Sequence, residues 1–196
     1  HEHEIEDSIF DMEFTPNRGD CLSLLGLARD LNVFYKTNLN IPIYEDELAP
    51  LNLNFINKTI EKCPEISFLN IQINDQVFEY KDYLNDYFRD FKINKNNFFT
   101  DVSNYVAYEM GQPTHSYDFS LIENDITLQE SNSSASFQTL LGNKIELDGL
   151  NLVFTSMDKV INLSGIVGGL DTACSSNTKD ALIECAYFRP DSIIGK

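Results

Sequence analysis

The stretch DVSNYVAYEMGQPTHSYD, residues 101–118, decides the fold, because the last predicted helix ends within it and short strands are predicted after it. The amphipathic segment SNYVAYEM runs into a Gly-Gln-Pro turn, and His115 follows directly. A turn can hold an imidazole at the rim of a pocket. Apart from His1 and His3, His115 is the only histidine in the 196 residues. The alternative is a histidine with satisfied hydrogen bonds beside an ordinary capped helix end.

The first third of the chain mixes strand and helix signals. Residues 9–14 alternate like a strand and end at the turn signal Thr-Pro-Asn. A helix is predicted over residues 21–35, with Asp20 as its N-cap. The polar connector IPIYEDELAP, residues 41–50, is the best candidate for a break between sub-lobes, near residues 40–50. The apolar face of the helix predicted over residues 21–35 would consist of Leu22, Leu25, Leu27, Leu31 and Phe34.

The middle of the chain contains two further segments with helical features. In residues 76–91 the aromatic residues Phe78, Tyr83, Tyr87 and Phe91 recur with helical spacing, which favours core packing over base stacking. The helix within the opening stretch should be capped by Thr100 or Asp101 and end before Gly111.

The remainder reads as strands separated by turn residues. Helices early and short strands throughout the second half predict an α+β fold, with mixed or antiparallel sheets layered with a few helices as a layered sandwich. The predicted strands are residues 51–55, 66–73, 126–130, 137–140, 144–147, 152–155, 160–163 and 181–186.

Composition limits the class of protein. A hydrophobic content of 42% with 14 Phe and 9 Tyr predicts a globular chain of one or two domains. No apolar run is long enough to span a bilayer, and the polar start without Met suggests an excised fragment. The four cysteines form no CxxC pair, which argues against a zinc site. A disulfide framework is not expected in a chain of this size, which favours a reducing cytoplasm. The net charge of −17 argues against autonomous RNA or membrane binding.

Three more stretches agree with residues 101–118 on one family. They are MEFTPNRGDCLSLLGL at 12–27, LSGIVGG at 163–169 and DALIECAYFRP at 180–190. In this order and spacing, the four resemble the central editing domain of the bacterial phenylalanyl-tRNA synthetase beta subunit over roughly residues 9–196. The resemblance implies that the whole chain, 1–196, is one such editing domain.

The resemblance implies proofreading, in which the ester of tyrosine wrongly joined to phenylalanine tRNA is hydrolysed. The implied partners are the 3′ end of that tRNA, tyrosine as the editing ligand, and the alpha subunit in an alpha2-beta2 assembly in the cytoplasm. ATP and Mg²⁺ would serve the whole synthetase, and this domain would need no cofactor, metal or membrane. The alternative is an editing-deficient scaffold or amino-acid-binding module. An unrelated hydrolase with Ser103 as nucleophile lacks a recognisable base and orienting acid.

Glu184 is the strongest candidate site residue, because it lies inside the otherwise apolar strand ALIECAYF. A carboxylate there is costly without a partner. Strand alternation could turn it to solvent, but Leu182 and Ala186 would share its face. By resemblance, Glu184 receives the phenolic hydroxyl of bound tyrosine. Sites built to bind a hydroxyl can reject analogues lacking it by ~10⁴.

Five other residues are site candidates through the same resemblance. Gly165 and Gly168, in a GIVGG run that otherwise reads as a tight turn, would line the amino-acid pocket. Ser103, Asn104 and His115 match pocket-wall and hydrolysis positions. Asn104 and His115 would orient a water or the ester, and His115 could be a general base if its pKa is near neutrality. Because an ester beside a free ribose hydroxyl is already activated, the alternative is that positioning a water is enough.

Three differences from the family also matter. Asn94 stands where the family commonly has an arginine, which removes a cation that could contact the tRNA end or the ligand. Ser103 corresponds to a family threonine and keeps the hydroxyl. The third difference is that the sequence stops at Lys196. In the family, a further threonine and a small residue of the pocket come from just beyond that point.

Overall fold

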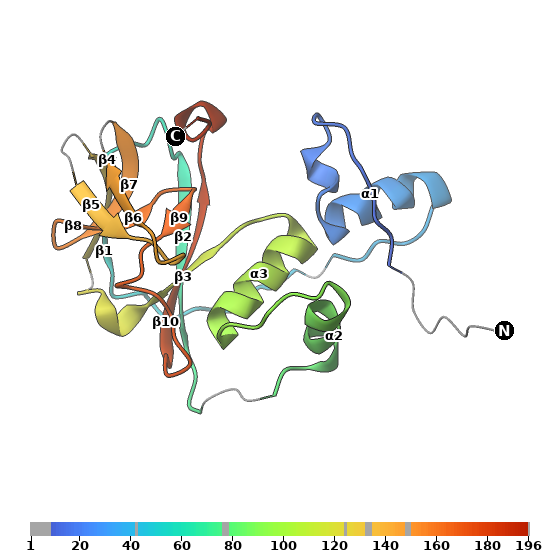
Figure 1. Cartoon of the computed structure of the whole chain (residues 1–196). Coiled ribbons are helices and arrows are strands. Elements are labelled where there is room, and N and C mark those ends of the chain that lie inside the picture. The colour runs from blue at the N-terminus through green and yellow to red at the C-terminus, as the bar shows by residue number, and fades with distance from the viewer. Residues whose placement is uncertain are drawn as a thin grey trace.

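The computed structural model describes residues 9–41, 43–75, 79–123, 125–131, 135–147 and 150–195. Within these ranges the chain forms two facing β-sheets, a small β-hairpin, and helices on one side (Figure 1). The predicted α+β class with layered, mixed sheets is confirmed. No helix in these ranges is long and apolar enough to cross a bilayer, and the four cysteines are free thiols.

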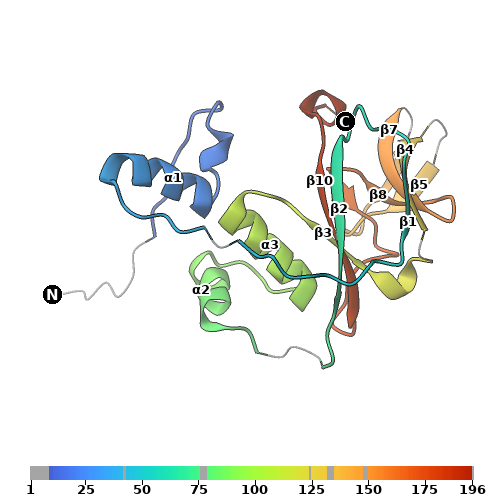
Figure 2. The same ribbon diagram turned by 180° about the vertical axis from the view of Figure 1, so that it is seen from behind.

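A three-stranded antiparallel sheet forms one face of the core. The central strand is β10 (Asp180–Tyr187), which pairs with β2 (Glu65–Gln72) on one side and β3 (His115–Asp118) on the other. Figure 2 shows β2 and β10 running side by side along much of their length. β3 was not predicted from the sequence, because its HSYD segment has almost no apolar residues.

A five-stranded mixed sheet forms the other face, in the order β1-β4-β7-β8-β9. The β1–β4 pair is parallel and the remaining pairs are antiparallel. The predicted strands are found here with slightly shifted ends, and β9 was not predicted. The strands are β1 (Asn54–Asn57), β4 (Asp125–Ser131), β7 (Asn151–Ser156), β8 (Lys159–Leu163) and β9 (Val167–Gly168).

The main core lies between these two sheets. Tyr117 and Leu182 from the three-stranded sheet belong to one buried cluster with Leu128 and Phe154 from the five-stranded sheet. A second cluster joins the other face of the five-stranded sheet to the hairpin of β5 (Ala135–Gln138) and β6 (Lys144–Leu147). Side chains therefore fill both faces of the five-stranded sheet.

Helix α3 (Phe98–Met110) packs beside the three-stranded sheet, on the face opposite the main core. The Ser116 hydroxyl, on the outer face of β3, donates to the carbonyl of Phe99 at 3.4 Å. Gly111 ends the helix with φ of +77°, as predicted. The predicted N-cap, Thr100 or Asp101, was wrong. The N-cap is Asn97, whose side-chain oxygen accepts a hydrogen bond from the Thr100 backbone amide.

The predicted aromatic stripe contributes less to the core than expected. Helix α2 (Asp82–Asp90) buries Leu84 and Phe88, whereas Tyr83 and Phe91 are exposed. Phe78 lies outside the described residues. The tyrosines of α2 instead form a half-exposed aromatic cluster with Tyr105 and Tyr108 of α3.

The N-terminal part differs most from expectation. Residues 9–14 form no strand, because no described strand pairs with them. Helix α1 runs over Leu24–Tyr35, and its N-cap is Ser23 and not Asp20. Asp20 belongs to the 3₁₀ turn η1 (Gly19–Cys21), where Arg18 pairs with it. The other short 3₁₀ turns are η2 (Phe119–Leu121) and η3 (Pro190–Ser192).

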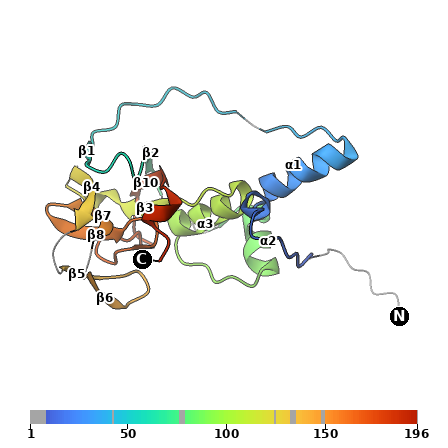
Figure 3. The ribbon, with the colours of Figure 1, turned by 90° about the horizontal axis from the view of Figure 1, so that it is seen from above.

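The apolar face predicted for α1 is largely open to solvent. Leu22 lies before the helix and is 70% exposed, and Phe34 is 78% exposed. Figure 3 shows α1 at the far end of the molecule from β1, connected by a long segment without regular structure. That segment includes the predicted connector, in which residue 42 is not described.

Candidate active site

A cavity of about 280 Å³ opens between residues of the two sheets. It lies between the turn that leads into β3, the turn between β8 and β9, and the end of β10. Its walls are residues 112–115 and 165–168 together with Asn162, Glu184, Ala186 and Phe188.

Glu184 lies at the buried side of this cavity and is 5% exposed. Because β10 alternates, Glu184 shares the inward face with Leu182 and Ala186, as the sequence predicts. Oε2 of its carboxyl accepts a hydrogen bond from the Tyr117 hydroxyl at 2.8 Å. Burial raises the pKa of Glu184 to about 7, against the opposing effect of that hydrogen bond. The carboxyl is therefore only partly ionised near neutral pH.

Tyr117 and Asn162 complete a buried polar chain behind the cavity. Nδ2 of Asn162 donates to the Tyr117 hydroxyl oxygen at 2.9 Å. A phenol has only one proton, and Tyr117 gives it to Glu184, so the amide must be the donor. Tyr117 is fully buried. Its ring belongs to the core, but its hydroxyl also contacts the site.

His115 is the first residue of β3 and pairs directly with Glu184 across the strands. Its ring meets the Tyr117 ring edge-on, with centroids 4.4 Å apart. Nε2 is buried without a hydrogen-bond partner among the described residues. Burial lowers the pKa of His115 to about 4, so the near-neutral pKa that general base catalysis favours is not found. At neutral pH the imidazole is uncharged.

Both predicted glycines line the cavity, each for a different steric reason. A Cβ on Gly168 would lie 2.1 Å from Cε1 and 2.7 Å from Nε2 of His115. Gly168 therefore makes room for the imidazole. Gly165 has φ of +71°, a left-handed conformation that favours glycine. The turn reading of GIVGG is thus correct at Gly165.

The remaining predicted residues lie outside the cavity wall. Ser103 is buried and donates to the carbonyl of Thr114 at 3.0 Å, so it holds a wall residue in place. Asn104 follows the buried Ser103 in α3. Because successive helix residues point about 100° apart, its side chain turns away to the exposed face. Asn94 is exposed in the loop between α2 and α3. The structure brings together His115, Gly165, Gly168 and Glu184, and it leaves Asn104 outside.

Asn162 is the functional candidate that sequence reasoning missed. It is 4% exposed, lines the cavity, and its Oδ1 is buried without a partner in the described ranges. His115 Nε2 is likewise buried without a hydrogen-bond partner among the described residues. Unpaired buried polar atoms are costly, so two of them at one cavity indicate a polar ligand or water there. The signal was present in VINLSG, where a lone amide interrupts an apolar strand.

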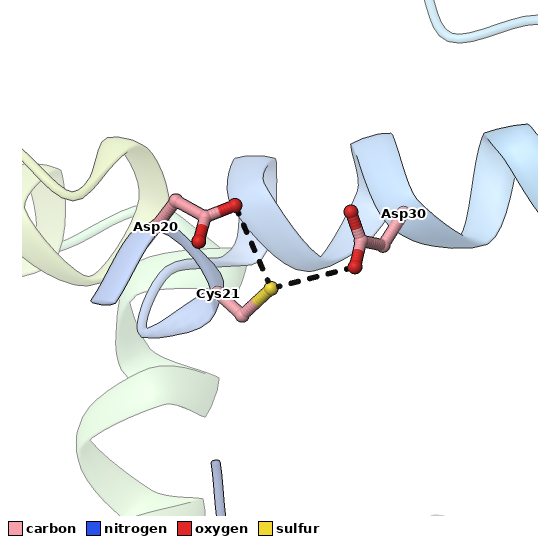
Figure 4. A group of neighbouring side chains, drawn as sticks. All are labelled: Asp20, Cys21 and Asp30. Carbon is pink, nitrogen blue, oxygen red and sulfur yellow. Dashed lines mark hydrogen bonds between the residues drawn. The ribbon is translucent and has the colours of Figure 1, made fainter. Parts of the chain in front are cut away.

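A second polar cluster lies on the α1 side of the molecule. Figure 4 shows the Cys21 thiol between the carboxylates of Asp20 and Asp30, close enough together to hold a metal ion. Arg18 already forms ion pairs with Asp20 at 3.0 Å and Asp30 at 2.6 Å. Its guanidinium supplies the positive charge, and the cluster is explained as a local structural network.

The protein family described as the B3/4 domain matches residues 62–196. The phenylalanine–tRNA ligase beta subunit of Fusobacterium nucleatum is 32% identical over 193 residues, which cover 96% of this chain and 24% of that protein. The beta subunit of Idiomarina loihiensis is 29% identical over 195 residues, which cover 98% of this chain and 24% of that protein.

The chain thus spans about a quarter of the length of these relatives. Among solved structures, an N-terminal fragment of the phenylalanyl-tRNA synthetase beta subunit from Pyrococcus horikoshii has a similar fold. Its TM-score is 0.53 at 14% identity, covering 90% of this chain and 55% of that one.

Proposed function

The chain belongs to the B3/4 domain family, and from this premise we propose that it is the proofreading part of a phenylalanine–tRNA ligase beta subunit. The reaction would be hydrolysis of the ester that joins tyrosine to phenylalanine tRNA. The similarity to beta subunits supports the assignment of this chain to a phenylalanine–tRNA ligase. The observation that carries the proofreading role is Glu184, a buried carboxyl in an apolar strand at the wall of a cavity.

Glu184 would select the ligand by its hydroxyl. A tyrosine side chain entering the cavity would present its phenol to the carboxyl, which can accept a hydrogen bond in either protonation state. Phenylalanine would fill the same volume without supplying that bond. The difference between the two esters would therefore reside in one polar contact, which is the kind of contact that discriminates strongly.

His115 would position rather than strongly activate the water. Its neutral imidazole has an unpaired Nε2 beside the cavity, which can hold a water or a ribose hydroxyl. With a pKa of about 4, it is a poor base at neutral pH. An ester next to a free hydroxyl is activated enough for a positioned water to attack. Asn104, exposed on α3, would orient the ester end of the tRNA from outside the cavity.

The rest of the synthetase would supply what this domain lacks. The net charge of −17 fits a domain that handles only the 3′ end of a tRNA held elsewhere. We expect an alpha subunit, in an alpha2-beta2 assembly in the cytoplasm, to carry out aminoacylation with ATP and Mg²⁺. Hydrolysis of the preformed ester would use neither cofactor.

The test is deacylation by the alpha–beta synthetase that contains this chain. Tyrosine and phenylalanine, each on phenylalanine tRNA, are offered to the native enzyme and to Glu184→Ala. We expect preferential release of tyrosine, lost in Glu184→Ala and kept in Glu146→Ala, whose carboxyl is on the surface. Equal, background release of both amino acids from the native enzyme would contradict proofreading.

Two observations favour the second candidate, an amino-acid-binding module or scaffold without editing. Asn94 lies at the expected arginine position, and Asn104 is outside the cavity. This function predicts that the chain binds L-tyrosine but leaves the tyrosyl ester on the tRNA intact.

A further inference from the structure

The carboxyl that would recognise a ligand hydroxyl already has a hydroxyl bound to it. Tyr117 donates to Glu184 Oε2 at 2.8 Å, and both residues are buried. No other side-chain hydrogen bond to Glu184 exists within the described residues. The phenol that occupies this carboxyl in the structure thus belongs to the chain itself.

Asn162 holds this phenol in a fixed orientation. Because its amide donates to the Tyr117 oxygen at 2.9 Å, one lone pair of that oxygen is occupied. The phenol proton then points to Glu184 and not into the cavity. Tyr117 is fully buried and is not part of the cavity wall, so solvent does not compete for the bond.

We propose that Tyr117 is a positioning residue that limits how strongly the pocket prefers tyrosine over phenylalanine, because its phenol gives Glu184 a permanent hydrogen-bond partner. The inference rests on the proposed function, in which Glu184 receives the ligand hydroxyl. It assigns to Tyr117 a role in specificity exerted through Glu184.

The physical reason is that the first hydrogen bond to a buried carboxyl is worth more than the second. With Tyr117 present, phenylalanine leaves the carboxyl with one partner, and tyrosine raises this to two. Without the Tyr117 hydroxyl, phenylalanine would leave a buried carboxyl with none. An unpaired buried polar group carries its full desolvation cost. Removal of the Tyr117 hydroxyl should therefore penalise phenylalanine more than tyrosine.

The variant Tyr117→Phe tests this directly, because it deletes the hydroxyl and keeps the core ring. Two selectivity ratios are measured on the synthetase: relative deacylation of the tyrosyl and phenylalanyl esters, and relative affinity for free L-tyrosine and L-phenylalanine. We expect both ratios to rise about fivefold or more, which is the lower end for an unpaired buried group. A ratio does not depend on the folded fraction, and Tyr117→Leu should shift it in the same direction.

Two controls separate this role from a structural one. Tyr105→Phe removes another phenol that bonds a carboxylate, that of Glu109 at 3.4 Å, and should leave both ratios unchanged. In a Glu184→Ala background, which offers no acceptor to the Tyr117 hydroxyl or to the ligand, Tyr117→Phe should have little effect on either ratio. A change that persists in that background would overturn action through Glu184.

The outcomes distinguish this inference from the proposed function. Tyrosine-selective deacylation with a ratio that Tyr117→Phe leaves unchanged or lowers would overturn the inference and uphold proofreading. A rising affinity ratio without any deacylation would support the inference and refute hydrolysis. Failure to bind or release either amino acid would overturn both.

Discussion

His115 and Glu184 are paired directly across β3 and β10, and burial moves their pKa values in opposite directions. The pKa of the imidazole falls to about 4 and that of the carboxyl rises to about 7. In each case the uncharged form is favoured, because desolvation penalises a charge of either sign. Near neutral pH the imidazole is therefore uncharged and the carboxyl only partly ionised, although the two ionisable residues are cross-strand neighbours.

The first prediction concerns the pH dependence of stability. The pKa of His115 is below its ordinary 6.5, so its contribution to stability is lost as the pH falls from about 6.5 to 4. The pKa of Glu184 is above its ordinary 4.5, so its contribution is lost as the pH rises from about 4.5 to 7. The two trends oppose each other between pH 4.5 and 6.5.

Single variants should expose each trend in urea unfolding over that range. Relative to the native protein, Glu184→Gln should gain stability as the pH rises, and His115→Gln should gain it as the pH falls, each by roughly 2 kcal/mol. Parallel stability profiles for the native protein and both variants would refute the burial-driven shifts.

The second prediction concerns Gly168. In Gly168→Ala the new methyl would lie 2.1 Å from Cε1 of His115, so the ring must move. Displacement of a positioning group by about 1 Å can cost about 100-fold in rate. We expect release of tyrosine from its tRNA to fall by about that factor while the melting temperature changes little. Gly19→Ala, at a glycine with open space around it, is the control and should keep full activity.

The third prediction concerns Gly26 in α1. Alanine in a helix interior is usually more stable than glycine by about 1 kcal/mol. Here a Cβ would lie 1.5 Å from the Asp20 carbonyl oxygen, so η1 and α1 could not keep their contact. Gly26→Ala should therefore destabilise the segment, and amide hydrogen exchange within Leu24–Tyr35 should accelerate. Slower exchange would show that helix propensity outweighs the clash.

The fourth prediction concerns Asp101, which is fully buried. Its carboxylate accepts from the Tyr80 hydroxyl at 2.7 Å and from the Asn96 amide at 2.9 Å. Asp101→Ala would leave both donors unpaired, so unfolding free energy should fall by about 1–3 kcal/mol. Asp86→Ala, which breaks an exposed ion pair with Arg89, should cost less than about 1 kcal/mol in the same chemical denaturation experiment.

The sequence was most informative where a residue conflicts with its surroundings. Glu184 was singled out because a charge is unexpected in an apolar strand, whereas Gly165 and Gly168 of GIVGG became site candidates through the family resemblance. Strands such as β6 and the end of α3 at Gly111 were predicted because periodicity and turn chemistry are local properties. These local signals also sufficed for the α+β class.

What could not be predicted depends on contacts distant in sequence. Tyr117 meets Glu184 from 67 residues away and Asn162 from 45 residues away, and neither separation leaves a local pattern. The apolar residues of α1 predicted a buried face, yet which surface covers a helix is decided by tertiary packing. Residues 9–14 have strand alternation, but no described strand is available to pair with them.

The position of β10 has a consequence for synthesis of the protein. β2 and β3 have no direct pairing with each other and are joined only through β10, which follows β2 by about a hundred residues. At typical translation rates, roughly 5 to 20 s separate the emergence of β2 from that of its partner. During that interval the nascent chain exposes an unpaired strand edge, and no part of the cavity can bind an amino acid. Ribosome-associated chaperones would therefore meet this domain before its recognition site, which includes Glu184 of β10, is complete.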